Sequence, residues 1–358
     1  MSLFTGLSPE KHATTRWARV LPEEIPTLAE VLRSQGYRTF GHTSGAFVSP
    51  TYGFGRGYEE YNQRLTGFQI ELNNVRARIE SLPPDDPYFI FIQTTSVHCP
   101  YAVLPHHEKA FRTQPRLKGE NLPISCLVDP TEVNLSETEY RTMSDRYDAS
   151  IRTADDHIGE FVDFLDARGE LDDTYLVLFS DHGDEFGDHG SVFHGHSLYE
   201  EMLHVPLIMI GGDAAPGVVK ERVSLIDFMP TILDLLGIDA PASEGRSLAE
   251  LVRSPKARQD EDTERPLFSA ADQLVRIRGV ISGRHKLILD LKSGEVDMYD
   301  LEADPMERTD IAASEPEIRD RLRGLLDQQL QKSPRGKASK ADLTPDHVEE
   351  LRALGYVE

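Results

Sequence analysis

Short apolar runs alternate with stretches of helical periodicity along the first two thirds of the chain, and this alternation constrains the fold most strongly. The runs at 88–97, 175–179 and 204–212 have the composition of strands that are covered on both faces. Apolar residues recur every three or four positions from 140 to 168 and again from 225 to 238, as in helices. Strands that alternate with helices predict an α/β fold with a mostly parallel sheet between helical layers.

The last third of the chain has a different pattern. A polar, irregular segment begins after about residue 240 and precedes three strand-like runs, LFSAA, VRIRGVISGRHKLILDL and EVDMYDL. These runs predict a small antiparallel α+β unit. We therefore predict an α/β domain at 1–240, an α+β subdomain at 241–331, and a linker with a terminal helix at 332–358. The helix is predicted from TPDHVEELRALGY, with Pro345 at its first position and Gly355 after its end.

The composition excludes several classes of partner. The formal net charge is −23, whereas nucleic acids and anionic membranes bind basic patches. No apolar run reaches the length of a transmembrane helix. No signal peptide is visible, so the chain as given predicts a cytoplasmic protein, and a missing N-terminus is the alternative that leaves the localisation open. Cys99 and Cys126 lack a CxxC spacing, and we expect two reduced thiols, with one disulfide as the alternative. Nothing in the sequence indicates an oligomeric state.

Charged side chains gather where two of the predicted strands end. Asp181 and His182 follow the run at 175–179, and His98 follows the run at 88–97. Ligands of open α/β sheets bind at the carboxyl ends of strands. A carboxylate oxygen next to an imidazole nitrogen can hold one divalent cation. The alternative for an isolated Asp-His pair is a solvated loop in which the aspartate caps the next helix.

A longer pattern decides between these alternatives. The pair continues as SDHGDEFGDHGSVFHGHSLYEEMLHVPLIMIGG. Before it in the chain stand SLFTGLSP, TLAEVLRSQGYRT, GFGRGYEEYN and HCPY, and after it stand RHKLILDL, MYDLEADPMERTDIA and LRALGYVE. In this order the segments resemble the sulfatase family of the alkaline phosphatase superfamily. The resemblance implies an alkaline-phosphatase-like α/β/α sandwich with a mostly parallel sheet and a small C-terminal antiparallel α+β unit.

The resemblance also implies a function, which is metal-dependent hydrolysis of sulfate esters. Asp181 and His182 would be ligands of a divalent metal, with Ca²⁺ expected first and Mg²⁺ or Mn²⁺ as alternatives. His98 would hydrogen-bond the sulfate or protonate the leaving oxygen, which imidazole can do near neutral pH. Either His194 or His196 would contact the same sulfate. The expected substrate is an anionic ester, a sulfated sugar or an aryl sulfate.

Other polar residues of the same segment are predicted to have no part in the chemistry. We expect Asp184, Glu185, Asp188 and His189 to be solvated loop residues. Residues 199–201 are expected to begin and orient a helix.

One part of the family pattern has no counterpart in this sequence. Sulfatases carry CxPSR or SxPSR just before the segment that matches SLFTGL, and the first residue of that motif is converted to the formylglycine nucleophile. Here the matching segment begins at Met1 or Ser2, so we expect the nucleophile and the first strand, with its acidic metal ligands, to be missing. Three hypotheses follow: a sulfatase that has lost its N-terminal piece, a phosphodiesterase or phosphoethanolamine-type transferase of the same superfamily, and a truncated non-catalytic binding or structural protein.

Overall fold

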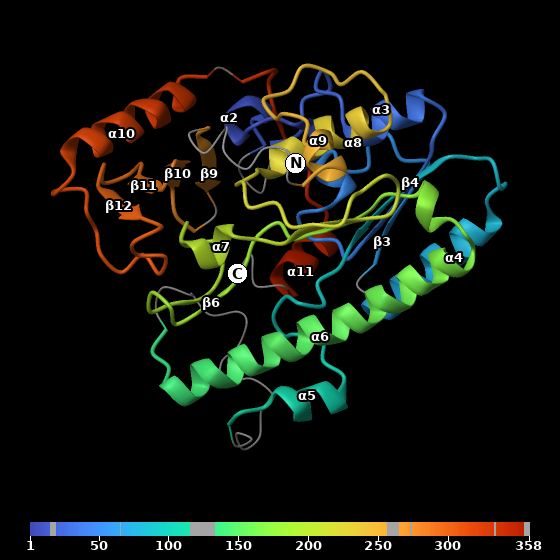
Figure 1. The fold of residues 1–358 in the computed structure, drawn as a ribbon, viewed down its shortest axis with the longest axis horizontal. Helices are drawn as coiled ribbons and strands as arrows, with labels where there is room; N and C mark the ends of the chain where they lie inside the picture. The colour runs from blue at the N-terminus through green and yellow to red at the C-terminus, as the bar shows by residue number, and fades with distance from the viewer. Residues whose placement is uncertain are drawn as a thin grey trace. The chain divides into compact units, whose positions relative to one another are not determined.

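The structure, a computed structural model, describes residues 1–14, 19–64, 66–114, 133–255, 265–272, 274–332 and 334–353 (Figure 1). The chain forms two compact units, each built from several segments. Unit 1 consists of Met1–Leu28, Tyr175–Gly183 and His194–Lys340, and unit 2 consists of Ala29–Thr174, Asp184–Phe193 and Ala341–Glu358. Both sides of the boundary predicted at residue 240 fall in unit 1, and the three-part domain division remains a prediction.

Unit 2 contains a three-stranded parallel sheet in the order β3-β2-β4. Its strands are β2 (Arg38–Thr43), β3 (Glu60–Gln63) and β4 (Tyr88–Gln93). Strands β3 and β4 lie on either side of β2, and α4 (Phe68–Ser81) lies in the connection that crosses from β3 to β4. The helix α3 (Leu28–Ser34) leads into β2, which is buried along most of its length.

Strand β4 ends at Gln93, earlier than the apolar run at 88–97 predicts. The hydroxyl of Thr94 accepts a hydrogen bond from the backbone N–H of Ser96 at 3.1 Å. Such local side-chain contacts compete with ladder hydrogen bonds and end strands. His98 therefore lies in the loop after the strand, where its backbone N–H donates to the carbonyl oxygen of Thr95 at 3.0 Å.

The long helix predicted at 140–168 is confirmed as α6 (Glu137–Ala167). It begins earlier than predicted because Ser136 and Glu139 form a capping box, which satisfies the first backbone N–H groups of the helix. Gly169 follows its end with φ of 70°, a conformation that glycine adopts without a steric cost. Within unit 2, α6 packs along α4 (Figure 1).

Unit 1 contains an antiparallel pair of strands, β5 (Leu176–Phe179) and β8 (Leu207–Ile210). Both lie within predicted apolar runs. Phe179 pairs with Leu207, so the end of β5 lies beside the start of β8. The chain therefore leaves β5 and enters β8 at the same end of this two-stranded sheet.

The predicted C-terminal strands are confirmed as a four-stranded antiparallel sheet in the order β12-β11-β10-β9 (Figure 1). Its strands are β9 (Leu267–Ala271), β10 (Ile277–Ser282), β11 (His285–Asp290) and β12 (Val296–Asp300). The helix α10 (Pro316–Leu330) packs against this sheet. Leu322 and Leu326 of the helix share a buried core with Val280, Leu287 and Met298.

The remaining described elements are short α-helices, 3-10 helices (labelled η) and two-residue strands. They are α1 (Ser2–Thr5), α2 (Pro9–His12), α5 (Pro105–Phe111), α7 (Glu200–Leu203), α8 (Phe228–Leu235), α9 (Ala249–Arg253), α11 (Pro345–Ala353), η1 (Pro50–Tyr52), η3 (Leu171–Asp173), η4 (Leu225–Asp227), β1 (Arg19–Val20), β6 (Glu185–Phe186), β7 (Val192–Phe193) and β13 (Ser339–Lys340). Helices α8 and α11 confirm the helices predicted from the sequence. Gly355 lies outside the described residues.

The prediction of reduced cysteines is wrong for Cys99, which is disulfide-bonded. This residue is buried and packs with Tyr101 and Met143 in a core of unit 2. Cys126 lies outside the described residues.

Candidate functional site

A tight turn carries Asp181 and His182 away from the end of β5. The hydroxyl of Ser180 donates a hydrogen bond to the carbonyl oxygen of His182 at 2.7 Å. A Cβ atom at Gly183 would lie 2.0 Å from the carbonyl oxygen of Glu201 in α7. Only glycine permits this close approach. The sequence SDHG therefore fixes the turn against α7.

The functional atoms of Asp181 and His182 lie close together. Oδ1 of Asp181 is 3.9 Å from Nε2 of His182. Nδ1 of His182 lies 2.9 Å from the carbonyl oxygen of Gly183. Because a carbonyl oxygen can only accept, Nδ1 carries the proton and Nε2 of the neutral ring presents its lone pair.

This arrangement fits a metal ion. Histidines that bind metals usually donate their other ring N–H to a carbonyl or carboxylate, as His182 does. Ligand distances of about 2.0–2.6 Å allow one ion to contact both Asp181 Oδ1 and His182 Nε2. The Asp181 side chain is 77% exposed, so an ion can reach it from solvent.

The charges around Asp181 favour its ionised form. Desolvation by the surrounding protein acts to raise the pKa of the Asp181 carboxyl, but the positive charge that His182 carries when protonated, a backbone hydrogen bond and the charge of a protonated His194 act to lower it. The net shift of the pKa is downward. A carboxylate that stays ionised is the form that binds a cation.

His194 lies beside His182 in the same unit. Their rings are stacked with centroids 4.0 Å apart and planes 28° from parallel. We call Asp181, His182 and His194 the strand-end cluster. His196 follows two residues later and is half-buried.

His98 belongs to unit 2. Its Nδ1 lies 2.7 Å from the carbonyl oxygen of Cys99, so Nδ1 donates and the neutral ring presents the lone pair at Nε2. The nearby Tyr101 is buried, and its hydroxyl donates to Oδ2 of Asp184 at 3.1 Å.

The prediction that the acidic loop is solvated is wrong for Asp184 and Glu185. Asp184 is buried and accepts the hydrogen bond from Tyr101. Glu185 is fully buried in β6, and its Oε1 accepts the backbone N–H groups of His189 and Ser191, both at 2.8 Å. These carboxylates satisfy buried donors within unit 2, and no short sequence motif signals that role.

The prediction for residues 199–201 is confirmed, because Tyr199 is the N-cap of α7. A buried ion-pair network, formed by Glu200, Lys286 and Glu307, holds this helix. Nζ of Lys286 lies 3.1 Å from Oε1 of Glu200 and 2.8 Å from Oε1 of Glu307. Oε2 of Glu307 accepts the backbone N–H of Glu200 at 2.7 Å.

This ion-pair network was not predicted from the sequence, although one signal for it was present. Lys286 stands in the apolar strand β11, and its side chain is fully buried. A lysine in such a position requires a buried anionic partner.

Family comparisons identify the class of protein. A model described as sulfatase matches residues 1–238, which is more than half of the chain. A second model, described as N-sulphoglucosamine sulphohydrolase, C-terminal, matches residues 187–334. The chain therefore belongs to the sulfatase family, as its sequence motifs predict.

Individual relatives agree with this assignment. Choline-sulfatase of Rhizobium meliloti (strain 1021) is 32% identical over 198 residues, which cover 54% of this chain and 37% of that protein. N-acetylglucosamine-6-sulfatase of Homo sapiens is 25% identical over 307 residues, which cover 70% of this chain and 55% of that protein. The chain thus spans between about a third and just over half of the length of these relatives.

The solved structures confirm the fold. The structure of BT4656 in complex with its substrate D-glucosamine-2-N,6-O-disulfate matches with a TM-score of 0.75 and 19% identity, over 92% of this chain and 86% of that one. The predicted alkaline-phosphatase-like α/β fold is correct. Within the described residues, no helix has the length and apolar composition needed to cross a bilayer.

Proposed function

We propose that this protein hydrolyses sulfate esters with a divalent metal ion bound by Asp181 and His182. One observation carries the proposal. Oδ1 of Asp181 lies 3.9 Å from Nε2 of His182, and the carbonyl oxygen of Gly183 binds the other ring nitrogen. Membership of the sulfatase family, which implies divalent metal binding, supports the assignment.

Cleavage of a sulfate ester places negative charge on the sulfate oxygens and on the leaving oxygen. When bound, a divalent ion would polarise the ester and offset part of this charge. We propose Ca²⁺, because Asp181 offers a hard oxygen ligand, with Mg²⁺ and Mn²⁺ as alternatives.

We assign the sulfate contact to His194 rather than to His196. The ring of His194 stacks on that of the proposed metal ligand His182, so its N–H can donate to a sulfate oxygen held there. We assign His98 as the proton donor to the leaving oxygen, on the strength of the family resemblance. Nδ1 already donates to the carbonyl oxygen of Cys99, so Nε2 would have to be protonated first and would then give that proton to the leaving oxygen.

The proposed substrate class is a sulfated sugar. One relative is named as an N-acetylglucosamine-6-sulfatase, and BT4656 was solved with a sulfated glucosamine as its substrate. Choline sulfate and aryl sulfates belong in the comparison, since another relative is named as a choline-sulfatase.

The test uses the natural protein, including any residues encoded before Met1, after chelation and reloading with Ca²⁺. Sulfate release is measured by ion chromatography from D-glucosamine-2-N,6-O-disulfate, choline sulfate and an aryl sulfate. Hydrolysis of an aryl phosphodiester is measured in parallel. The proposal predicts metal-dependent sulfate release that exceeds diester hydrolysis. Faster diester hydrolysis would favour a phosphodiesterase, and saturable binding without turnover would favour a binding protein.

A further inference from the structure

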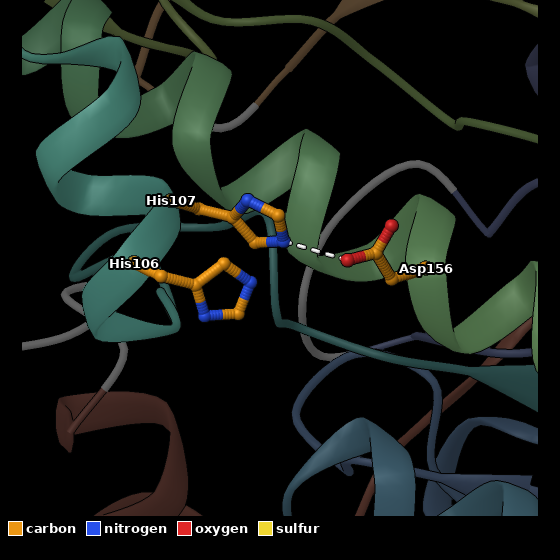
Figure 2. Close-up of side chains that lie close together, drawn as sticks. All are labelled: His106, His107 and Asp156. Carbon is orange, nitrogen blue, oxygen red and sulfur yellow. Dashed lines mark hydrogen bonds and ion pairs between the residues drawn. The ribbon is translucent and has the colours of Figure 1, made fainter.

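A second group of histidine and aspartate side chains lies within unit 2, where α5 meets α6 (Figure 2). His106 and His107 belong to α5, and Asp156 belongs to α6. One potential ligand atom from each of these residues lies within 4.8 Å of the other two. We call these residues the helix-pair cluster.

The three side chains extend toward a common point. Figure 2 shows both imidazole rings reaching from α5 toward the carboxylate on α6. Nε2 of His107 lies 2.7 Å from Oδ2 of Asp156, and the rings of His106 and His107 have centroids 3.9 Å apart. A His-Asp ion pair involves a single imidazole, whereas here the ring of His106 also lies beside that of His107.

The donor set matches a particular class of ion. Two imidazole nitrogens and one carboxylate oxygen form a ligand set that Zn²⁺ occupies in proteins, with water in the remaining position. Ca²⁺ and Mg²⁺ prefer sets made of oxygen alone. With two imidazole nitrogens among its three donors, the helix-pair cluster favours a transition metal over Ca²⁺ or Mg²⁺.

Asp156 is ionised and oriented for such a role. A hydrogen bond from His107 and the charge of Arg152 hold the pKa of the Asp156 carboxyl below its ordinary value. Arg152, which is 50% exposed, binds Oδ1 at 2.6 Å and leaves Oδ2 facing His107. A metal ion would replace the proton that His107 shares with Asp156.

The backbone around the cluster is fixed by other contacts of the same two helices. The N–H of Leu104, the N-cap of α5, donates to Oγ1 of Thr153 in α6 at 3.1 Å. After α5, the N–H of Thr113 donates to Oδ2 of Asp145 at 2.6 Å. Because α5 is tied to α6 at both ends, the ligands need little rearrangement to bind an ion.

We propose that His106, His107 and Asp156 bind one divalent transition-metal ion, with Zn²⁺ as the best match. The ion links α5 to α6 and keeps at least one position for water.

The test is a calorimetric titration of the natural protein with Zn²⁺, in the presence of excess Ca²⁺ to occupy the strand-end cluster. His106→Ala is the main variant, because its exposed ring can be removed without opening a core. The loss of one ligand should weaken Zn²⁺ binding by about 10-fold or more. His204→Ala, which removes an exposed histidine in unit 1, is the matched control and should bind Zn²⁺ as the unmodified protein does.

A second measurement keeps the proposal testable if a variant is poorly folded. Co²⁺ bound to the unmodified protein should give visible absorption bands that change in Asp156→Asn, with the far-ultraviolet circular dichroism of both proteins compared first. Unchanged Zn²⁺ affinity and stoichiometry in His106→Ala would overturn the proposal. So would Co²⁺ spectra that are identical with and without the Asp156 carboxylate.

Discussion

The strand-end cluster and the helix-pair cluster use the same kinds of side chain but are assembled differently. Asp181 and His182 are consecutive residues whose positions follow from the end of one strand. His107 and Asp156 are 49 residues apart and meet only because two helices pack. The Asp181-His182 pair is therefore a local sequence motif, whereas the His107-Asp156 pair forms only through tertiary packing.

The difference extends to what supports each cluster. Six residues after His194, Glu200 begins α7, and the buried network of Glu200, Lys286 and Glu307 ties it to the C-terminal sheet. Glu307 adopts a left-handed backbone with φ of 51°, a conformation that costs about 1–2 kcal/mol for a residue with a side chain. The helix-pair cluster depends instead on contacts between its own two helices.

Removal of the Asp181 carboxylate should have the largest effect. Asp181→Ala in the natural protein should lose its bound Ca²⁺ and lower kcat/KM for sulfate esters by about 10³-fold or more, because charge stabilisation by a metal is worth several kcal/mol. Metal content is measured by mass spectrometry beside the kinetics. Asp172→Ala, an exposed aspartate before β5, serves as the control. Zn²⁺ affinity at the helix-pair cluster should not change, and a change there would mean that the clusters are not independent.

Breaking the ion-pair network of Glu200, Lys286 and Glu307 should have the second-largest effect. Lys286→Met leaves the carboxylate of Glu307, which is 1% exposed, without its cation, and should lower the free energy of unfolding by about 3–5 kcal/mol. Urea unfolding measures this loss. The double variant Lys286→Met/Glu307→Gln should regain part of it, because no buried charge is then left uncompensated. If the free energy of unfolding of the single variant lies within about 1 kcal/mol of the unmodified protein, the network does not stabilise the fold as proposed.

The two loop histidines can be separated by kinetics. His194→Ala should lower kcat/KM by about 10²-fold, the scale of a lost acid–base or charge-stabilising group, while His196→Ala should have a much smaller effect. Far-ultraviolet circular dichroism checks that both variants are folded. The reverse order of effects would transfer the sulfate contact to His196.

The sequence could reveal the strand-end cluster because strand periodicity and the SDHG motif are local. It also predicted the long helix α6 and the C-terminal antiparallel strands, whose apolar patterns are strong. The sequence could not predict the burial of Glu185, because its burial depends on how the following loop places the backbone N–H groups of His189 and Ser191 against it. The sequence could not predict the contact between His107 and Asp156 either, because no sequence periodicity shows which helix packs against α5.

The smallest expected effect concerns His12, a histidine that the structure assigns to packing. It is buried, its Nε2 donates to Oγ of Ser2 at 3.0 Å, and its Nδ1 accepts the N–H of Thr14 at 3.0 Å. Burial, with the nearby amino group of Met1, lowers the pKa of His12 to about 3.

In the unfolded chain this histidine takes up a proton near pH 6.5, whereas in the folded protein it does not. The free energy of unfolding should therefore fall as pH drops below about 6.5, by about 1.4 kcal/mol per pH unit from this group. Urea unfolding between pH 7 and pH 5 should show a shallower pH dependence in His12→Gln. An equal pH dependence of unfolding in both proteins would mean that the folded protein does not hold His12 in its neutral form.

The most direct test of the central claim is removal and return of the metal. Sulfate release by the natural protein is measured after chelation and again after Ca²⁺ is restored, in the unmodified protein and in Asp181→Ala. We expect chelation to abolish turnover, and we expect Ca²⁺ to restore turnover only in the protein that retains Asp181. Turnover that survives chelation, or an Asp181→Ala variant that recovers as fully as the unmodified protein, would contradict the assignment of the strand-end cluster as the metal site.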